Sequence, residues 1–276
     1  MAGSSLYMPV PEDFRLSTWL AIGACIYAIA ERWFPFWVVV QFPILLLAAR
    51  TIQATLMARG LLTSGRSNTV PGRYSTRIPA SNPEDQGIVV FVLGARINHP
   101  MGRLAPGFLD AGTIFTGMWR ECNRNRKKYG YLGKTSTLMA SQEEGGLTMV
   151  WLTYWKTVEG LRDFGASDAH RALQIPWLAK KYPYLGIMHE TYSAPKGNWE
   201  TIYHHFQPFG MGKTKFMVGP SLTDDSNAAD REKRLRFASP LVKAEGREMR
   251  SMFSRMGRGE DIALARWNPE AKDFDE

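Results

Sequence analysis

The chain has 276 residues, of which 45% are hydrophobic and 12% aromatic, enough for one folded domain with an accessory segment. The formal net charge is +8, but the positive charge is scattered, and no zinc-ligand spacing or RNA-binding aromatic motif accompanies it. We therefore expect no nucleic-acid partner. The two cysteines, Cys25 and Cys122, lie in an apolar run and on an expected helix, which disfavours a disulfide framework.

The first long segment, Leu16 to Ala58, is apolar and is interrupted by Glu31 and Arg32. Three interpretations are open. The segment is a helical hairpin with both arms in a bilayer and Pro35 at its turn, or a single tilted span beginning near Trp33. The third is a helical hairpin buried in a soluble domain. Each uncharged arm is shorter than the roughly 20 residues of a full span.

The flanks of this segment favour a membrane. Tryptophans suited to the interfacial belt lie at Trp19, Trp33 and Trp37, and arginines follow at Arg50, Arg59 and Arg66. We expect a membrane-associated protein, at the endoplasmic reticulum, with its folded domain in the cytosol. A signal peptide is disfavoured because no basic region precedes the apolar run.

The remaining chain divides by composition. Residues 1–60 form the membrane-associated segment, and residues 61–86, rich in Ser, Gly, Pro and Arg, are expected to be a linker. A folded domain is expected over 87–218. Residues 219–276 are polar and mixed in charge, with a possible surface helix within 228–256, and we expect a partly disordered tail.

Hydrophobic periodicity sets the element order of the domain. Strands are expected at Gly87–Asn98, Tyr131–Gln142, Leu147–Trp155 and Tyr184–Tyr192, helices at Phe108–Arg126 and Lys156–Lys181, a turn at Glu143–Gly146, and a last strand or arm at Trp199–Phe206. This order is that of the α+β ferredoxin-like split βαβ fold. Helices cover one face of such a sheet, so we expect a second copy to cover the other and the last element to reach across a homodimer.

The strand Tyr184–Tyr192 carries unusual polar groups for a buried strand. Alternation places His189 on one face with Ile187, and Glu190 on the other with Tyr192. Because His189 and Glu190 point to opposite faces, they cannot chelate one metal together. A metal site built from His99, His170 and His189 is conceivable, but we expect none.

Four motifs resemble a family of fungal and bacterial proteins labelled as monooxygenases and related to the antibiotic-biosynthesis monooxygenases. They are the segments Val89–Asn98, Gly186–Tyr192, Glu200–Tyr203 and Pro208–Gly212, and the passage from Tyr154 to His170 agrees with them. The chain is identified as a fungal-type member with an added N-terminal membrane segment. The resemblance covers Gly87–Gly212 and implies a dimeric α/β-barrel fold and an oxygenase activity.

No cofactor motif occurs in the sequence: the Gly-Lys-Thr triplet at Gly212 lacks the first glycine of a P-loop, and no His-Glu-x-x-His is present. We expect no cofactor. Acid–base candidates are His189, Glu190, Arg96 and His170, and expected substrate contacts in an apolar cavity are His99, Trp119, Trp151, Trp155, Tyr192 and Tyr203. Structural alternatives stay open: an Arg96–Glu190 ion pair, a surface position for His170, and core packing for the aromatic residues.

Three functions are compatible with these residues. The first is a cofactor-independent monooxygenase that acts on a lipophilic small molecule of secondary metabolism. The second is a cofactor-free cyclase or pericyclase, of the Diels–Alder type, that shapes a terpenoid or polyketide. The third is a lipophile-binding protein without catalysis. The resemblance favours the first.

Overall fold

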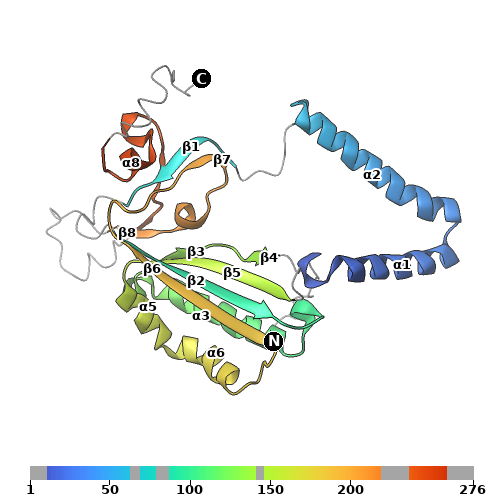
Figure 1. Cartoon of the computed structure of the whole chain (residues 1–276), viewed down its shortest axis with the longest axis horizontal. Coiled ribbons are helices and arrows are strands. Elements are labelled where there is room, and N and C mark those ends of the chain that lie inside the picture. The colour runs from blue at the N-terminus through green and yellow to red at the C-terminus, as the bar shows by residue number, and fades with distance from the viewer. Residues whose placement is uncertain (1–10, 63–68, 79–86, 141–145, 219–235, 260–276) are drawn as a thin grey trace.

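A computed structural model describes residues 11–62, 69–78, 87–140, 146–218 and 236–259. Its main body is an antiparallel sheet with helices on one face (Figure 1). The strand order is β3-β5-β2-β6, with β4 also paired to β5. The strands span Ile88–Ile97 (β2), Tyr131–Lys134 (β3), Leu138–Ala140 (β4), Leu147–Trp155 (β5) and Leu185–Ala194 (β6).

This order confirms the ferredoxin-like fold. In chain order the strands are β2, β3 with β4, β5 and β6, and the last strand pairs with the first, which itself pairs with the third. Helices α3 (Phe108–Arg124), α4 (Arg126–Tyr129), α5 (Val158–Gly165) and α6 (Asp168–Leu178) complete the split βαβ units. The fold class is therefore mixed α+β, as the hydrophobic pattern predicted.

The expected second strand, 131–142, is broken in two. Thr135 is 1% exposed, and its hydroxyl accepts a hydrogen bond from the Leu152 backbone NH at 3.1 Å. This bond interrupts the ladder between β3 and β4. The expected turn at 143–146 lies mostly outside the described residues.

The register of β2 with its two neighbours decides which side chains share a face. Leu93 pairs with both Trp151 and His189, and Val92 pairs with both Leu152 and Glu190. Odd-numbered residues of all three strands therefore face the helices, and even-numbered residues face the other way. We call these two sides the helix face and the open face.

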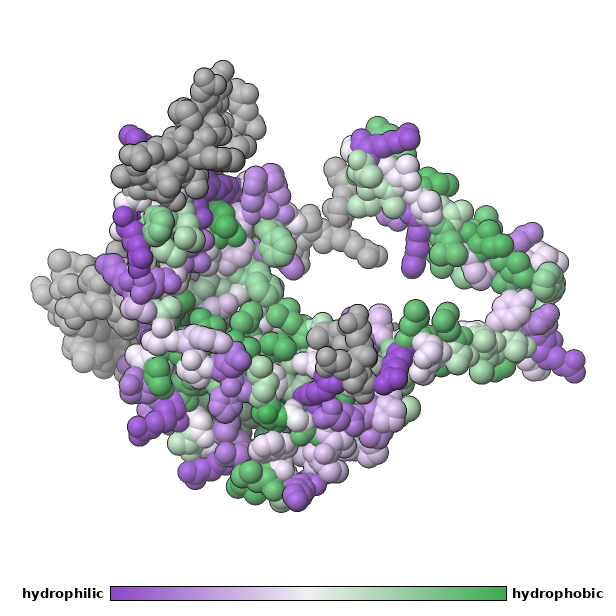
Figure 2. All heavy atoms as spheres, viewed as in Figure 1, coloured by the Kyte–Doolittle hydropathy of each residue, from purple (hydrophilic) through white to green (hydrophobic). Residues whose placement is uncertain are grey.

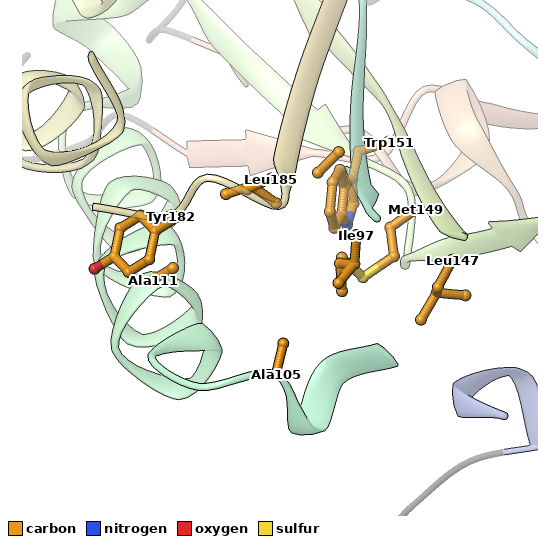
Figure 3. Packing of buried hydrophobic residues seen from close by; sticks show 9 residues of the cluster. Ile97, Ala105, Ala111, Leu147, Met149, Trp151, Tyr182 and Leu185 are labelled. Carbon is orange, nitrogen blue, oxygen red and sulfur yellow. The ribbon is translucent and has the colours of Figure 1, made fainter. Parts of the chain in front are cut away.

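The helix face is a closed aromatic and aliphatic core. At one end Ile97, Leu147 and Met149 pack with Trp151, Ala111 and Tyr182, as Figure 3 shows. At the other end Trp155, Tyr131 and Phe164 pack with Trp119. Trp155 is 0% exposed and Phe164 4%, so burial of large rings holds α3 and α5 against the sheet.

Part of the open face is covered by the same chain. Tyr154 and Ile88 pack there against Met211 and Phe216, which come from η3 (Gly210–Lys213) and β8 (Phe216–Val218). The expectation that this face is left bare for a second copy is therefore wrong for this end of the sheet. Glycine at position 210 allows this close contact, because a Cβ there would lie 2.5 Å from the Tyr154 hydroxyl oxygen.

A second, three-stranded sheet has the order β10-β1-β7. It joins β1 (Val70–Thr76), β7 (Tyr203–Phe206) and β10 (Leu241–Lys243), and β9 (Arg236–Ala238) pairs with β8. Strand β1 lies inside the expected linker, and β7 pairs with this strand of its own chain. The linker prediction is thus wrong at 70–76, and the expected arm toward a partner is a strand within this sheet.

The C-terminal segment also contains ordered structure. Beyond β9 and β10 it forms η4 (Arg247–Met249) and α8 (Met252–Arg255). Arg255 Nε lies 2.7 Å from Glu200 Oε2, with the two side chains only 8% and 17% exposed. This largely buried ion pair ties α8 to the segment between β6 and β7, and such a tie was not expected of a polar, partly disordered tail.

The N-terminal segment is a helical hairpin of α1 (Leu16–Trp33) and α2 (Phe36–Ala58). It projects from the sheet domain in Figure 1, and neither helix has a buried residue. Green apolar side chains run along both arms in Figure 2. Helix α2 is long and apolar enough to cross a membrane, which agrees with a span beginning near Trp33.

The base of the hairpin is fixed to the domain by a buried charge pair. Asp13, in η1 (Pro11–Asp13), is 0% exposed, and both of its carboxylate oxygens accept hydrogen bonds from Arg103, at 2.8 and 2.9 Å. Arg103 belongs to η2 (Gly102–Leu104), just after β2. Gly102 permits this approach, because a Cβ there would lie 2.5 Å from the Asp13 carbonyl oxygen.

Candidate functional site

The strand that carries the most specific motif, β6, lies at the edge of the main sheet, and from Ile187 to Ser193 its residues are exposed on both faces. Alternation places His189 on the helix face and Glu190 with Tyr192 on the open face, as the period-two pattern predicted. The expected acid–base groups are therefore divided between two faces. Tyr192 does not accompany His189.

Two of the candidate imidazoles lie on the helix face. The His189 ring lies against Phe91 of β2, with centroids 5.3 Å apart and planes at 31°. Across from β6, His170 on α6 meets Phe164 edge-on, with centroids 5.9 Å apart. The charge that His189 carries when protonated lowers the pKa of His170, so the two side chains interact electrostatically. The structure thus places on one face two residues that are 19 positions apart in sequence and were both predicted for the site.

The environment of His170 keeps its imidazole neutral. Burial lowers its pKa from the ordinary value, the nearby His189 lowers it further, and the Gly165 backbone acts in the opposite direction. Its Nδ1 atom is buried and has no hydrogen-bond partner among the described residues. A half-buried imidazole that favours its neutral form and has an unused nitrogen can accept a proton.

The three candidate tryptophans form the core behind this pair. Trp119, Trp151 and Trp155 are 5%, 4% and 0% exposed and contact Phe115, Tyr131 and Phe164. This is the core alternative of the sequence analysis, and it differs from the expected role as an open cavity wall. Trp119 Nε1, like His170 Nδ1, is buried without a partner in the described part of the chain.

On the open face Tyr192 donates a hydrogen bond to Glu190 Oε2, with oxygens 2.5 Å apart. That bond and the adjacent negative charge raise the pKa of Tyr192. Both side chains are exposed. The pair is a surface feature of the open face, away from His189.

Arg96 bonds to side chains just after β2 and on β5. Its Nε donates to Asn98 Oδ1 at 2.9 Å and its Nη1 to Thr148 Oγ1 at 3.1 Å. On the open face Arg96 pairs with Gly186, four residues along β6 from Glu190. Four residues of strand span roughly 13 Å, so the Arg96–Glu190 ion pair, one of the open alternatives, would require both side chains to extend along the strand.

His99 and Tyr203 have structural roles. The Nδ1 of His99 accepts a hydrogen bond from the Met101 backbone NH at 3.1 Å, and its ring meets Tyr184 edge-on. The Tyr203 hydroxyl donates to the Phe209 carbonyl at 2.6 Å and accepts from the Gly212 backbone NH at 2.9 Å. The Pro-Phe-Gly-x-Gly motif is therefore a turn held by Tyr203, and neither residue joins the histidine pair.

Metal binding has no support in the described part of the chain, where no group of three or more His, Cys, Asp or Glu residues could hold an ion. A cavity of about 20 Å³ between Arg126, Lys156 and Phe237 has room for about one water molecule. A groove of about 400 Å³ lies between the arms of the hairpin. Neither contains the histidines.

Two aromatic residues of the site, Phe91 and Phe164, were not among the predicted site residues. Phe91 pairs with Thr191 of β6, so its ring lies on the helix face directly beside His189. The alternation of side chains along β2 predicts the face of the sheet on which Phe91 lies. Its contact with His189 of β6 depends on the pairing register of the two strands. Phe164 was part of the motif that carried the family resemblance, and burial against three other aromatic rings explains its place there.

Comparison with known proteins finds a family model that is similar to the sheet domain. Residues 88–211 match the family described as Monooxygenase af470-like. The Monooxygenase af470 of Aspergillus fumigatus is 26% identical over 258 residues, which cover 90% of each chain. That alignment extends beyond the family match into the hairpin and the C-terminal segment.

Solved structures are more distant. SnoaB, a cofactor-independent oxygenase from Streptomyces nogalater, is 14% identical, covering 38% of this chain and 90% of that one, with a TM-score of 0.26. An aldoxime dehydratase in complex with butyraldoxime is 16% identical, covering 71% of this chain and 46% of that one, with a TM-score of 0.38. The fold assignment above rests on the strand pairing of the chain itself.

The lowered pKa of His170 predicts a pH-dependent stability. Because the native pKa is below the unfolded value of about 6.5, the unfolded state binds more protons as the pH falls, so stability is complete above that value and declines below it. His170→Asn should flatten this decline between pH 7.5 and pH 5. Urea unfolding at several pH values measures it, with exposed His204→Asn as the matched control. An unchanged slope in the His170 variant would contradict the assignment.

Proposed function

We propose that this chain, whose residues 88–211 match the Monooxygenase af470-like family, is a cofactor-independent monooxygenase that acts on a lipophilic small molecule. The observation that carries the proposal is that His170 and His189 share the helix face, His189 against Phe91 and His170 against Phe164. The name of the Aspergillus relative supports the reaction class. The product belongs, in this proposal, to secondary metabolism.

The two histidines have distinct roles in the proposal. His170 is neutral and partly buried, so it removes a proton from an activated carbon of the substrate. His189 is exposed at the sheet edge and passes that proton to solvent. Phe91 and Phe164 offer flat apolar surfaces to a conjugated substrate. In this proposal His170 is unprotonated at neutral pH and can therefore take the proton from the substrate.

The chemistry balances without a further reductant. Proton removal from a doubly activated CH₂ leaves a carbanion, which passes one electron to O₂ to give a carbon radical and superoxide. These combine to a peroxide that takes up a proton and loses water, so that R₂CH₂ and O₂ become R₂C=O and H₂O. The protein has to provide only the base, the apolar surroundings and access for O₂.

Removal of either imidazole tests this proposal. We expect His170→Phe and His189→Phe to lower the rate of O₂-dependent turnover by about 10²- to 10⁴-fold, the usual contribution of a general base. The substrate is first obtained by metabolite profiling of a strain that lacks the gene. His204→Phe, on exposed β7, is the control and should keep full activity.

Oxygen dependence separates the alternatives. A product isomeric with its substrate, formed under strict anaerobiosis, would replace the oxygenase with a cyclase. Ligand binding with no turnover in wild type would replace both with a lipophile-binding protein. A Soret or flavin absorption band in the purified protein would contradict the cofactor-free mechanism.

The proposed substrate class agrees with a membrane attachment through the hairpin. Helix α2 is unburied and apolar enough to span, and the groove of about 400 Å³ between the arms is lined by side chains such as Ile26, Phe34 and Phe42. Lipid would fill this groove. We propose that α2 anchors the chain in the endoplasmic reticulum membrane, with the sheet domain in the cytosol.

A charge in the middle of α2 tests the anchor. Leu46→Arg should cost about 2.5–3.5 kcal/mol of insertion, because arginine at a bilayer centre is poorly solvated. Flotation of full-length protein with lipid vesicles measures the loss. Gln53→Arg, near the polar end of the same helix, is the matched control and should float as wild type does. Equal flotation of both variants would contradict a spanning role for α2.

We also propose that the uncovered part of the open face mediates a homodimer. Met188 and Tyr192 of β6 are 47% and 54% exposed there, and β6 leaves one edge of the sheet unpaired. A twofold contact would bury both residues of each copy.

Charge on this face should separate the copies. Met188→Asp places a carboxylate on both sides of a twofold contact and should weaken dimerisation at least tenfold, about 1.4 kcal/mol. Sedimentation equilibrium in detergent measures the association. Val158→Asp, on α5 at the opposite face of the sheet, should leave it unchanged. A monomeric wild-type protein would refute the proposal.

A further inference from the structure

A group of exposed apolar side chains lies at one end of the sheet domain. We call it the end patch, and it consists of Met101 (45% exposed), Leu104 (41%), Leu109 (62%), Ile175 (63%) and Leu178 (63%). These residues come from η2, the start of α3 and the end of α6. Scattered apolar residues are ordinary on a protein surface, but five of them on three adjoining elements are a candidate interaction site.

Hydrogen bonds and strand pairing bring the three elements to the same end. The Tyr184 hydroxyl, just before β6, donates to the Pro106 carbonyl between η2 and α3 at 2.7 Å. Trp177 of α6 donates from Nε1 to the Leu185 carbonyl at 2.9 Å. Leu185 pairs with Ile97, the last residue of β2. The end of α6, the start of α3 and η2 therefore surround one end of the central strands.

The hairpin is rooted at this same end. The Asp13–Arg103 pair joins η1 to η2, between Met101 and Leu104 of the end patch. Trp19 Nε1 donates to the Pro11 carbonyl at 2.8 Å, and Phe14 meets Trp19 edge-on, which fixes the direction in which α1 leaves the domain. Leu16 and Leu20, at the start of α1, are 73% and 65% exposed. Exposed apolar surface thus begins in the end patch and resumes at the base of the hairpin.

A strained cation borders the end patch. Lys180 ends α6 with φ of +58°, in the left-handed region that glycine adopts without a Cβ clash. Its amide donates to the Trp177 carbonyl, as in a glycine-terminated helix. Lys181 follows it and is also exposed, and Arg15 lies at the hairpin base. A lysine held where glycine fits better points to a use for its charge.

We propose that the end patch is a second membrane contact, through which the domain lies on a bilayer surface that contains anionic lipid. The proposal rests on the membrane attachment of the hairpin proposed above. The apolar side chains enter the interface, while Lys180, Lys181 and Arg15 meet lipid phosphates. A bilayer is favoured over a second copy because the end patch adjoins the hairpin base and is bordered by these three cations, which outnumber the carboxylate of Asp110 in the first turn of α3.

A fluorescent probe on the full-length chain measures this contact. In a Cys25→Ser background, where Cys122 is buried, the probe is attached at Leu178→Cys. The matched control carries it at Val158→Cys, which is 45% exposed at the start of α5 and lies at the opposite end of the sheet. Both proteins are reconstituted in phosphatidylcholine vesicles with and without phosphatidylserine, and lipids brominated near the headgroup quench any probe at the surface.

We expect quenching at position 178 and none at 158, with stronger quenching when phosphatidylserine is present. Ile175→Asp should abolish it while the protein still floats with vesicles. Lys180→Gly should lower the ratio of docked to undocked domain by about fivefold on anionic vesicles. The same variant should raise the urea midpoint of unfolding, because glycine relieves the left-handed strain. A merely structural lysine would not combine these two effects.

Each contrary result would have a different consequence for the two membrane proposals. Flotation without quenching at 178 would overturn the second contact and leave the hairpin anchor intact. Loss of flotation in wild type would overturn both. Concentration-dependent shielding of the probe without vesicles would show that the end patch binds another copy of the chain, which also overturns the proposal.

Discussion

The pairing of β2 with both neighbours is the constraint on which the rest of the domain depends. A single register aligns Leu93 with Trp151 and His189, and Val92 with Leu152 and Glu190. A slip of one residue would move every one of these side chains to the opposite face. The aromatic core, the histidine pair and the Glu190–Tyr192 surface pair all follow from that alignment. Burial of Trp155 and Ile97 at the two ends of the sheet holds it in place.

Local pattern was enough to predict the main strands of the sheet domain and the order of its elements, because each obeys a period that three or four neighbouring residues already show. It also placed His189 and Glu190 on opposite faces. It could not predict that Trp119, Trp151 and Trp155 are buried among other aromatic rings, since that depends on how α3 and α5 fit the sheet. The same limit applies to Phe91, whose contact with His189 is fixed by pairing across 98 positions of the chain.

The contacts that sequence reasoning missed join polar segments far apart in the chain. Asp13 reaches Arg103, and Arg255 reaches Glu200, each through a buried or nearly buried ion pair. Such pairs leave no periodic pattern in the sequence. A single charged residue has the same local sequence signal in an exposed loop as in a buried ion pair. For this reason residues 70–76 were interpreted as linker and the region after 235 as tail, although both complete the second sheet.

The position of the hairpin base sets the distance between the proposed membrane contact and the proposed base. His189 pairs with Leu93, four residues along β2 from Ile97 at the anchored end, a distance of roughly 13 Å. A lipophilic molecule of a few fused rings spans a comparable length. If the end patch rests on the bilayer, such a molecule can keep its apolar part in the lipid while its activated carbon approaches His170 along the open edge of β6. The outer edge of β6, which pairs with no other strand among the described residues and carries exposed Ile187 and His189, would then serve as a path between membrane and base.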